Sequence, residues 1–223
     1  MKVAILRFPG TNCEFDTQYA FEKLGYSTEL VWHKQESLSK DFDLVVVPGG
    51  FSYGDYLRSG SIACFSPIMK AVSKYAKSGG KVLGICNGFQ ILTEVGLLPG
   101  ALKRNNNLHF ISKHQTLYVE NNNNAFLNQC DKGEVLNIPI AHADGNYYID
   151  DEGIKKLESN GQVLLRYCDK AGNRVMVNGS VASIAGICNE KKNVFGLMPH
   201  PERALESILG SEDGIKMLKG FKV

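Results

Sequence analysis

The residue best suited to chemistry is Cys86, in the run Gly84-Ile85-Cys86-Asn87-Gly88. The mostly apolar residues 81–85 before it are typical of a buried strand, and a helix is expected after it. A Gly-x-Cys-x-Gly turn between a strand and a helix is the pattern of a nucleophile elbow, which lifts one side chain above the sheet edge. A helix N-terminus pointing at a thiol favours the reactive thiolate. The sequence therefore predicts a cysteine nucleophile, whereas an inert, buried role suits Cys64, Cys168 and Cys188.

A cysteine nucleophile needs a base, and His200 is the best candidate among the five histidines. It directly follows an expected strand that ends on Pro199, and Glu202 stands two residues later. A doubly wound sheet places its chemistry beyond the carboxyl ends of its strands, so His200 can stand beside Cys86. Glu202 would then accept a hydrogen bond from the second ring nitrogen and fix the tautomer. The alternative is a surface His-Pro-Glu turn without such a role.

The run Pro48-Gly49-Gly50-Phe51 follows another expected strand and would lie at the same sheet edge. Glycine lets the main chain approach a tetrahedral intermediate closely, and the N–H after a nucleophile supplies a second donor. We therefore expect the backbone N–H groups of Gly50 and Asn87 to form an oxyanion hole. The alternative is a Gly-Gly turn that only connects two elements.

The elements that must position these residues alternate between strand and helix in the first hundred residues. We expect strands at 2–8, 28–32, 43–48 and 81–85, and helices at 14–24 and 65–76. Short, nearly all-apolar strands separated by helices predict a parallel sheet that is covered on both faces.

The second half of the chain predicts additional antiparallel strands. Residues 174–177 and 180–187 flank Asn178-Gly179, which is a strong hairpin signal. A last strand is expected at 193–198, followed by helices at 204–209 and 214–221, whereas the asparagine runs 105–107 and 121–124 are expected as exposed loops. The prediction is one α/β domain spanning 1–223, with a doubly wound, mostly parallel central sheet flanked by helices and extra antiparallel strands.

Composition excludes several other classes. The net charge is +2, without long basic runs, so neither nucleic acid nor a membrane surface is expected as a partner. None of the six cysteines forms a C-x-x-C pair, so no metal site is expected. The first apolar run is too short for a signal peptide, which predicts a cytoplasmic protein with reduced thiols.

Together these motifs resemble class I, triad-type glutamine amidotransferases. Four further runs narrow the resemblance to the family of glutaminase subunits of phosphoribosylformylglycinamidine synthase, an enzyme of de novo purine biosynthesis: Arg7 to Glu14, Gly49 to Arg58, Gly100 to Asn105 and Pro139 to His142. One departure is visible, because Gly-Glu-Gly is expected after His142 and this chain has Ala143-Asp144-Gly145. That departure leaves the role of Asp144 open.

The resemblance implies that Cys86 attacks the side-chain amide of glutamine and that ammonia passes to a larger synthetase subunit. With ATP and Mg²⁺, that subunit would convert formylglycinamide ribonucleotide to its amidine, beside a small accessory subunit. This chain itself would need no cofactor, since it lacks a phosphate-binding Gly-rich loop ending in Lys-Ser/Thr. Gly49, Phe51 and Gln90 are the candidate glutamine contacts, and the segment 53–58 is either a docking or gating element or a solvated loop.

Three alternatives remain open. Another amidotransferase subunit or a γ-glutamyl hydrolase would share the elbow and the triad but not the runs 7–14 and 49–58. A thiol sensor or chaperone-like protein would carry a reactive cysteine without a histidine base, so the His200 and Glu202 pair counts against it. A non-catalytic regulatory module would tolerate the loss of Cys86.

Overall fold

The computed structural model describes residues 1–222 and centres on a nine-stranded mixed sheet, in the order β2-β1-β3-β4-β11-β10-β9-β6-β7. Five neighbouring strands are parallel: β2 (Ser27–Trp32), β1 (Lys2–Arg7), β3 (Leu44–Val47), β4 (Lys81–Ile85) and β11 (Val194–Leu197). Four antiparallel strands follow: β10 (Ile184–Cys188), β9 (Val163–Tyr167), β6 (Ile111–Val119) and β7 (Val135–His142). The expected mostly parallel sheet with antiparallel additions is therefore confirmed.

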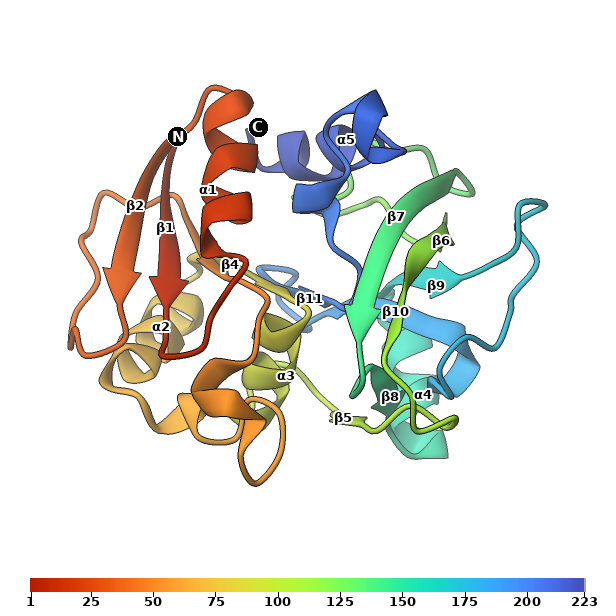
Figure 1. The fold of residues 1–223 in the computed structure, drawn as a ribbon, viewed down its shortest axis with the longest axis horizontal. Coiled ribbons are helices and arrows are strands. Elements are labelled where there is room, and N and C mark those ends of the chain that lie inside the picture. Colours follow the sequence, from red (N-terminus) through yellow and green to blue (C-terminus); the bar gives the residue numbers. More distant parts are fainter. Residues whose placement is uncertain (223) are drawn as a thin grey trace.

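Five α-helices accompany the sheet within residues 1–222. The α-helices are α1 (Glu14–Lys23), α2 (Pro67–Lys77), α3 (Asn87–Glu94), α4 (Asp151–Ser159) and α5 (Gly214–Lys219). A separate two-stranded sheet pairs β5 (Ala101–Lys103) with β8 (Asn146–Tyr148). Figure 1 shows the parallel half on the left, the antiparallel strands on the right and α3 between them. Within residues 1–222, no helix combines the length and the apolar character that crossing a bilayer requires.

The strand register brings three loops to one edge of the sheet. Every residue of β3 is completely buried, as expected for a strand covered on both faces. Val47 of β3 pairs with Gly84 of β4, and Leu197 of β11 pairs with Ile85. Because these three strands run in parallel, the segments that follow them leave the sheet side by side.

Three sequence-based expectations are wrong. The hairpin around Asn178-Gly179 does not form, because β10 pairs with β9 on one side and with β11 on the other. Asn178 is buried instead, and its Nδ2 donates to the carbonyl of Gly145 at 2.8 Å, so the turn serves a tertiary contact. Residues 204–209 contain a short 3₁₀ turn (Ser207–Leu209) and no α-helix. Asn105 is fully buried, unlike the exposed loop that its asparagine run suggested.

Candidate active site

Cys86 occupies a strained elbow between β4 and α3. Its φ of 50° and ψ of −106° place a non-glycine residue at positive φ. A Cβ on Gly84 would lie 2.7 Å from the carbonyl of Gly88, and a Cβ on Gly88 would lie 1.8 Å from the carbonyl oxygen of Val47. Both positions therefore require glycine for α3 to pack this closely on the ends of β3 and β4.

His200 follows β11 and makes a tight pair with Glu202. Its Nδ1 lies 2.7 Å from Oε1 of Glu202, and its backbone N–H donates to the carbonyl of Pro139 at 2.8 Å. Only 1% of His200 and 3% of Glu202 is exposed. The carboxylate therefore accepts a hydrogen bond from the Nδ1–H group, which leaves Nε2 as the ring nitrogen that can take a proton.

The electrostatics of His200 connect it to Cys86. Burial by itself lowers the pKa of His200, but the Glu202 carboxylate and then the Cys86 thiol raise that pKa well above its ordinary value. The two side chains are thus close enough for their charges to interact. The structure thus brings together the three side chains that the sequence selected as a triad, and the raised pKa makes His200 a good acceptor for a thiol proton.

The Gly49-Gly50 turn lies against the imidazole. A Cβ on Gly49 would lie 2.9 Å from Cε1 of His200, and Gly50 has a φ of 137° that favours glycine. The N–H of Phe51 donates to Gly10 O and that of Ser52 to Asn87 Oδ1, which leaves the N–H of Gly50 available among the described residues.

The second candidate donor is the N–H of Asn87, the first residue of α3. Its N–H belongs to the first turn of the helix, where backbone donors have no intrahelical partner. Its side chain holds neighbouring groups in place, because Nδ2 donates to Oδ1 of Asp55 at 3.2 Å and to Oε1 of Gln90 at 2.8 Å. Gln90 in turn donates to the backbone carbonyl of Asp144 at 2.8 Å, so this amide links α3 to the loop that follows β7.

Two parts of the site were not predicted from the sequence. Strand β7 lies across the site, and its Ala141 carbonyl accepts from Cys86 Sγ at 3.6 Å. The alternation of buried Leu136, Ile138 and Ile140 with less buried neighbours was the available signal for this strand. Cys13, at the start of α1, carries a second buried thiol near His200, and nothing local in the sequence indicates that proximity.

Cys13, His200 and Glu202 have donor atoms within 4.8 Å of one another, the one such group among residues 1–222. The arrangement does not fit a resident cation. Glu202 is already engaged by Nδ1 of His200, and the Arg203 guanidinium donates to Cys13 Sγ at 3.1 Å. A positive charge at that distance disfavours a metal ion at the thiol.

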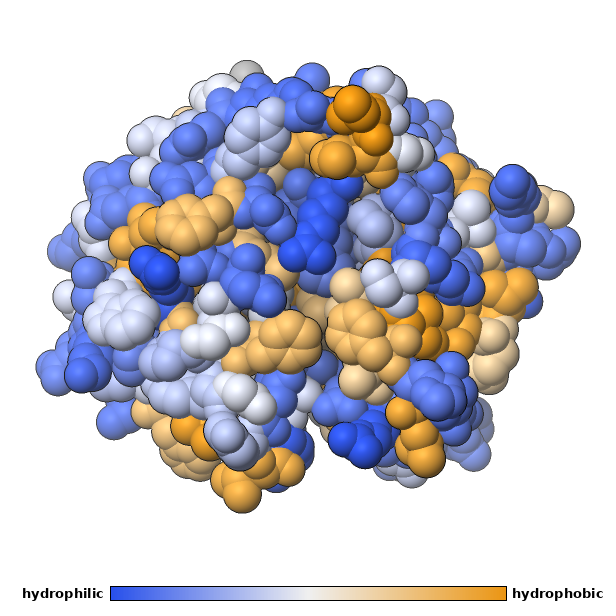
Figure 2. Space-filling view, in the orientation of Figure 1, coloured by the Kyte–Doolittle hydropathy of each residue, from blue (hydrophilic) through white to orange (hydrophobic). Residues whose placement is uncertain are grey.

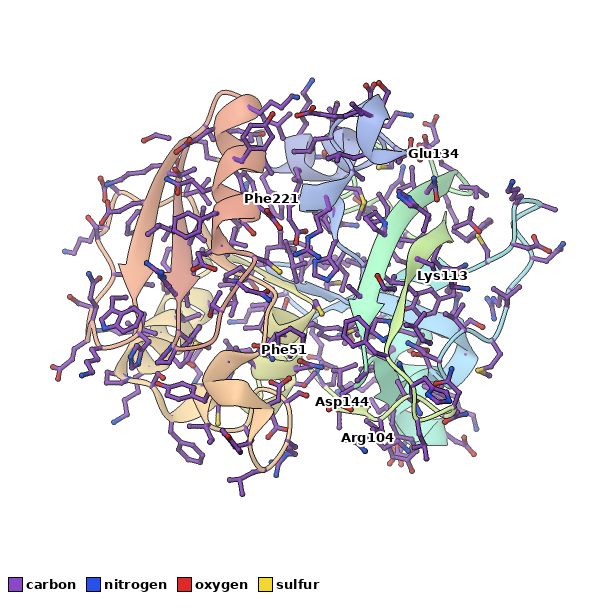
Figure 3. The ribbon with its side chains drawn as sticks, viewed as in Figure 1. Phe51, Arg104, Lys113, Glu134, Asp144 and Phe221 are labelled. Atoms are coloured by element: carbon purple, nitrogen blue, oxygen red, sulfur yellow. The ribbon has the colours of Figure 1, made fainter. Side chains whose placement is uncertain are left out.

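Two aromatic side chains meet beside the Gly49-Gly50 turn. Only 6% of Cys86 is exposed. Phe51 and Phe110 are about half exposed, and their ring centroids are 6.5 Å apart, which joins the oxyanion turn to the loop before β6. Figure 2 shows apolar side chains meeting in the middle of this face, and Figure 3 places Phe51 there.

Comparison with known proteins agrees with this geometry. A family model described as CobB/CobQ-like glutamine amidotransferase domain matches residues 1–214. Phosphoribosylformylglycinamidine synthase subunit PurQ of Sulfurimonas denitrificans is 70% identical over 221 residues, which cover 99% of each chain. The protein of the same name from Campylobacter jejuni is 60% identical and covers 99% of this chain and 96% of its own.

Among solved structures, the structure of PurLQS from Thermotoga maritima contains a chain with 44% identity and a TM-score of 0.89. The match covers 99% of this chain and 97% of that one. A glutamine amidotransferase from Thermotoga maritima, at 17% identity and a TM-score of 0.61, shares the fold over 92% of this chain and 77% of its own.

Proposed function

The chain belongs to the CobB/CobQ-like glutamine amidotransferase family, and from that premise we infer that it is the glutaminase subunit of phosphoribosylformylglycinamidine synthase. It hydrolyses glutamine and supplies ammonia for the conversion of formylglycinamide ribonucleotide to its amidine. The observation that carries this assignment is the 70% identity to a PurQ protein over 99% of both chains. A thiol sensor or a non-catalytic module would not need the buried imidazole and carboxylate beside Cys86.

Cys86 opens the proposed reaction. His200 takes the thiol proton, and the sulfur attacks the carboxamide carbon of glutamine. The developing oxyanion accepts hydrogen bonds from the N–H groups of Gly50 and Asn87. Glu202 holds the protonated imidazole in the correct orientation and stabilises its charge.

The tetrahedral intermediate then collapses. His200 returns the proton to the leaving nitrogen, so the C–N bond breaks, ammonia departs and a γ-glutamyl thioester remains on Cys86. Water, activated by the now neutral His200, attacks the thioester, and the C–S bond breaks to release glutamate and restore the thiol. Each turnover converts one glutamine and one water to glutamate and ammonia.

We place the steps that use ATP and Mg²⁺ on a larger synthetase subunit, with a small accessory subunit beside it. The similarity to a PurLQS structure supports this arrangement. Exposed apolar side chains on the loops favour a protein partner: Tyr56, Leu57, Phe65 and Leu108 are between 71% and 90% exposed. The segment 53–58 is therefore our candidate for the docking element.

The decisive experiment compares glutamine with ammonia as the nitrogen source in the reconstituted complex. Cys86→Ala should lower glutamine-dependent amidine formation by at least about 10⁴-fold and leave ammonia-dependent formation near the original rate. Cys188→Ala is the matched control, because burial raises the pKa of that thiol to about 11 and keeps it unreactive. Equal loss with both nitrogen sources would show that Cys86 is structural or serves the synthetase step.

A further inference from the structure

His142, the last residue of β7, carries a buried nitrogen without a partner. The residue is 3% exposed, and within residues 1–222 its Nε2 has no hydrogen-bond partner. Leaving a buried polar atom unpaired is costly, so such an atom in a native protein calls for a ligand or another explanation. Nε2 of His200 also lacks a hydrogen-bond partner among the described residues, and in the proposed reaction that atom takes the thiol proton.

The hydrogen bonds of Asn105 determine which nitrogen of His142 carries the proton. The Asn105 Nδ2 donates to the carbonyls of His109 and His142, both at 2.9 Å. Its Oδ1 accepts from the N–H of Gly145 at 3.0 Å, so the orientation of the amide is fixed. That oxygen lies 3.2 Å from Nδ1 of His142, which must therefore be the protonated nitrogen. Nε2 is left as a hydrogen-bond acceptor.

The imidazole is held rigidly and stays neutral. A Cβ on Gly145 would lie 2.3 Å from Nδ1 of His142, so the loop packs directly on the ring. Burial, and then the charge of His200, lower the pKa of His142 to about 4. At neutral pH this residue therefore offers an acceptor and cannot supply an N–H from Nε2.

Carboxylates lie near His142, in addition to the charge of His200. The neighbouring Ala141 carbonyl contacts Cys86 Sγ, so this end of β7 borders the nucleophile. Asp144 lies within electrostatic reach of the imidazole, and Arg104 is 3.6 Å from its carboxylate. Figure 3 shows the Asp144 and Arg104 labels together, below that of Phe51. Asp55 and Asp144 are linked through the Asn87 and Gln90 amides, and burial and then Asp144 raise the pKa of Asp55 to about 6.

We propose that Nε2 of His142 accepts a hydrogen bond from the α-ammonium of bound glutamine, an inference that rests on the proposed function. The reacting carboxamide must lie between Cys86 and His200, so the carboxamide nitrogen already has the His200 imidazole as its partner. The α-ammonium is the other N–H donor of glutamine, and the nearby carboxylates complement its charge. His142 would thus distinguish glutamine from amides that lack an amino group.

The test measures kcat and KM of the assembled complex with glutamine and with glutaramate, which is glutamine without its α-ammonium. His142→Asn keeps a donor for Asn105 but removes the acceptor at the position of Nε2. It should lower kcat/KM for glutamine about 10- to 100-fold more than for glutaramate, chiefly through KM. His142→Gln places an amide oxygen near that position and should restore most of the lost preference for glutamine.

Equal losses with both substrates, or no loss with either, would overturn the proposal. If His142→Asn does not assemble with its partners, His142→Leu takes its place as the variant without an acceptor: a collapsed preference for glutamine supports the contact, and a preference within about threefold of wild type contradicts it. A wild-type complex that hydrolyses neither substrate would instead refute the glutaminase assignment.

Discussion

Nδ1 of His200 and Oε1 of Glu202 lie 2.7 Å apart in a pair that is almost completely shielded from solvent. The two residues are close in sequence, yet their function depends on a thiol more than one hundred positions away. The Glu202 carboxylate raises the pKa of the imidazole, and so does the charge of the Cys86 sulfur.

Glu202→Gln should therefore impair catalysis more than folding. The amide can still meet Nδ1, but it no longer stabilises the imidazolium, and the pKa of His200 should fall. We expect kcat for glutamine hydrolysis to drop by about 10²- to 10⁴-fold. Glu206→Gln is the matched control, because Glu206 pairs with Lys23 at the surface. A Glu202→Gln variant within about threefold of wild-type kcat would contradict an orienting role.

Gly49→Ala should displace the imidazole. The added methyl would lie 2.9 Å from Cε1 of His200 and 3.0 Å from Sγ of Cys13. A displacement of this kind should reduce kcat by about 10²-fold. Gly79→Ala is the control, because it should change stability and not catalysis. Gly79 has a φ of 96° and no neighbour within 4 Å of the added carbon. That control should lose about 1 kcal/mol of unfolding free energy in urea and keep its kcat.

His142 should make the chain sensitive to acid. Its pKa is about 4 in the folded chain and about 6.5 when unfolded, so the unfolded state binds more protons between these values. Its contribution to stability is complete above pH 6.5 and is lost as the pH falls towards 4, by about 3 kcal/mol in total. Urea unfolding of wild type and His142→Asn at about pH 7.5 and about pH 5 measures this contribution.

The wild-type chain should lose more unfolding free energy than His142→Asn between those two pH values. The comparison of slopes is needed because Asp55 and His200 have raised pKa values and shift stability in the opposite direction. Parallel pH dependence in the two proteins would show that His142 titrates normally.

Leu57→Asp should weaken binding to the synthetase. Leu57 is 90% exposed, so its apolar side chain is left in solvent. Its φ of 71° is also an unfavourable backbone conformation for a leucine. A partner that buries this side chain would explain both features, and we expect the Kd of the complex to rise at least about tenfold. Met176→Asp is the control, since Met176 is 67% exposed on a separate loop. Equal affinity of the Leu57 variant and wild type would place the interface elsewhere.

The parallel half of the fold was readable because most of its strands are short apolar runs and helical segments stand between them. The same local patterns located Cys86, His200 and Glu202. The hairpin prediction failed because Asn178 serves a buried contact to Gly145 in place of a two-residue turn. Asn105 was misread for a similar reason, since three of the four hydrogen bonds of its amide are made with His142 and Gly145, about forty residues away.

The amino-acid sequence by itself determined the nucleophile, the glycines of its elbow and the His-Pro-Glu segment, because each depends on neighbours in the chain. Only the tertiary structure decided that β7 crosses the site, that a second thiol at Cys13 faces His200 and that Nε2 of His142 has no partner among the described residues. Those features depend on strand register and on which distant groups satisfy each buried hydrogen bond. Local composition does not encode either one, since the energy of a buried polar atom is set by whatever the fold places next to it.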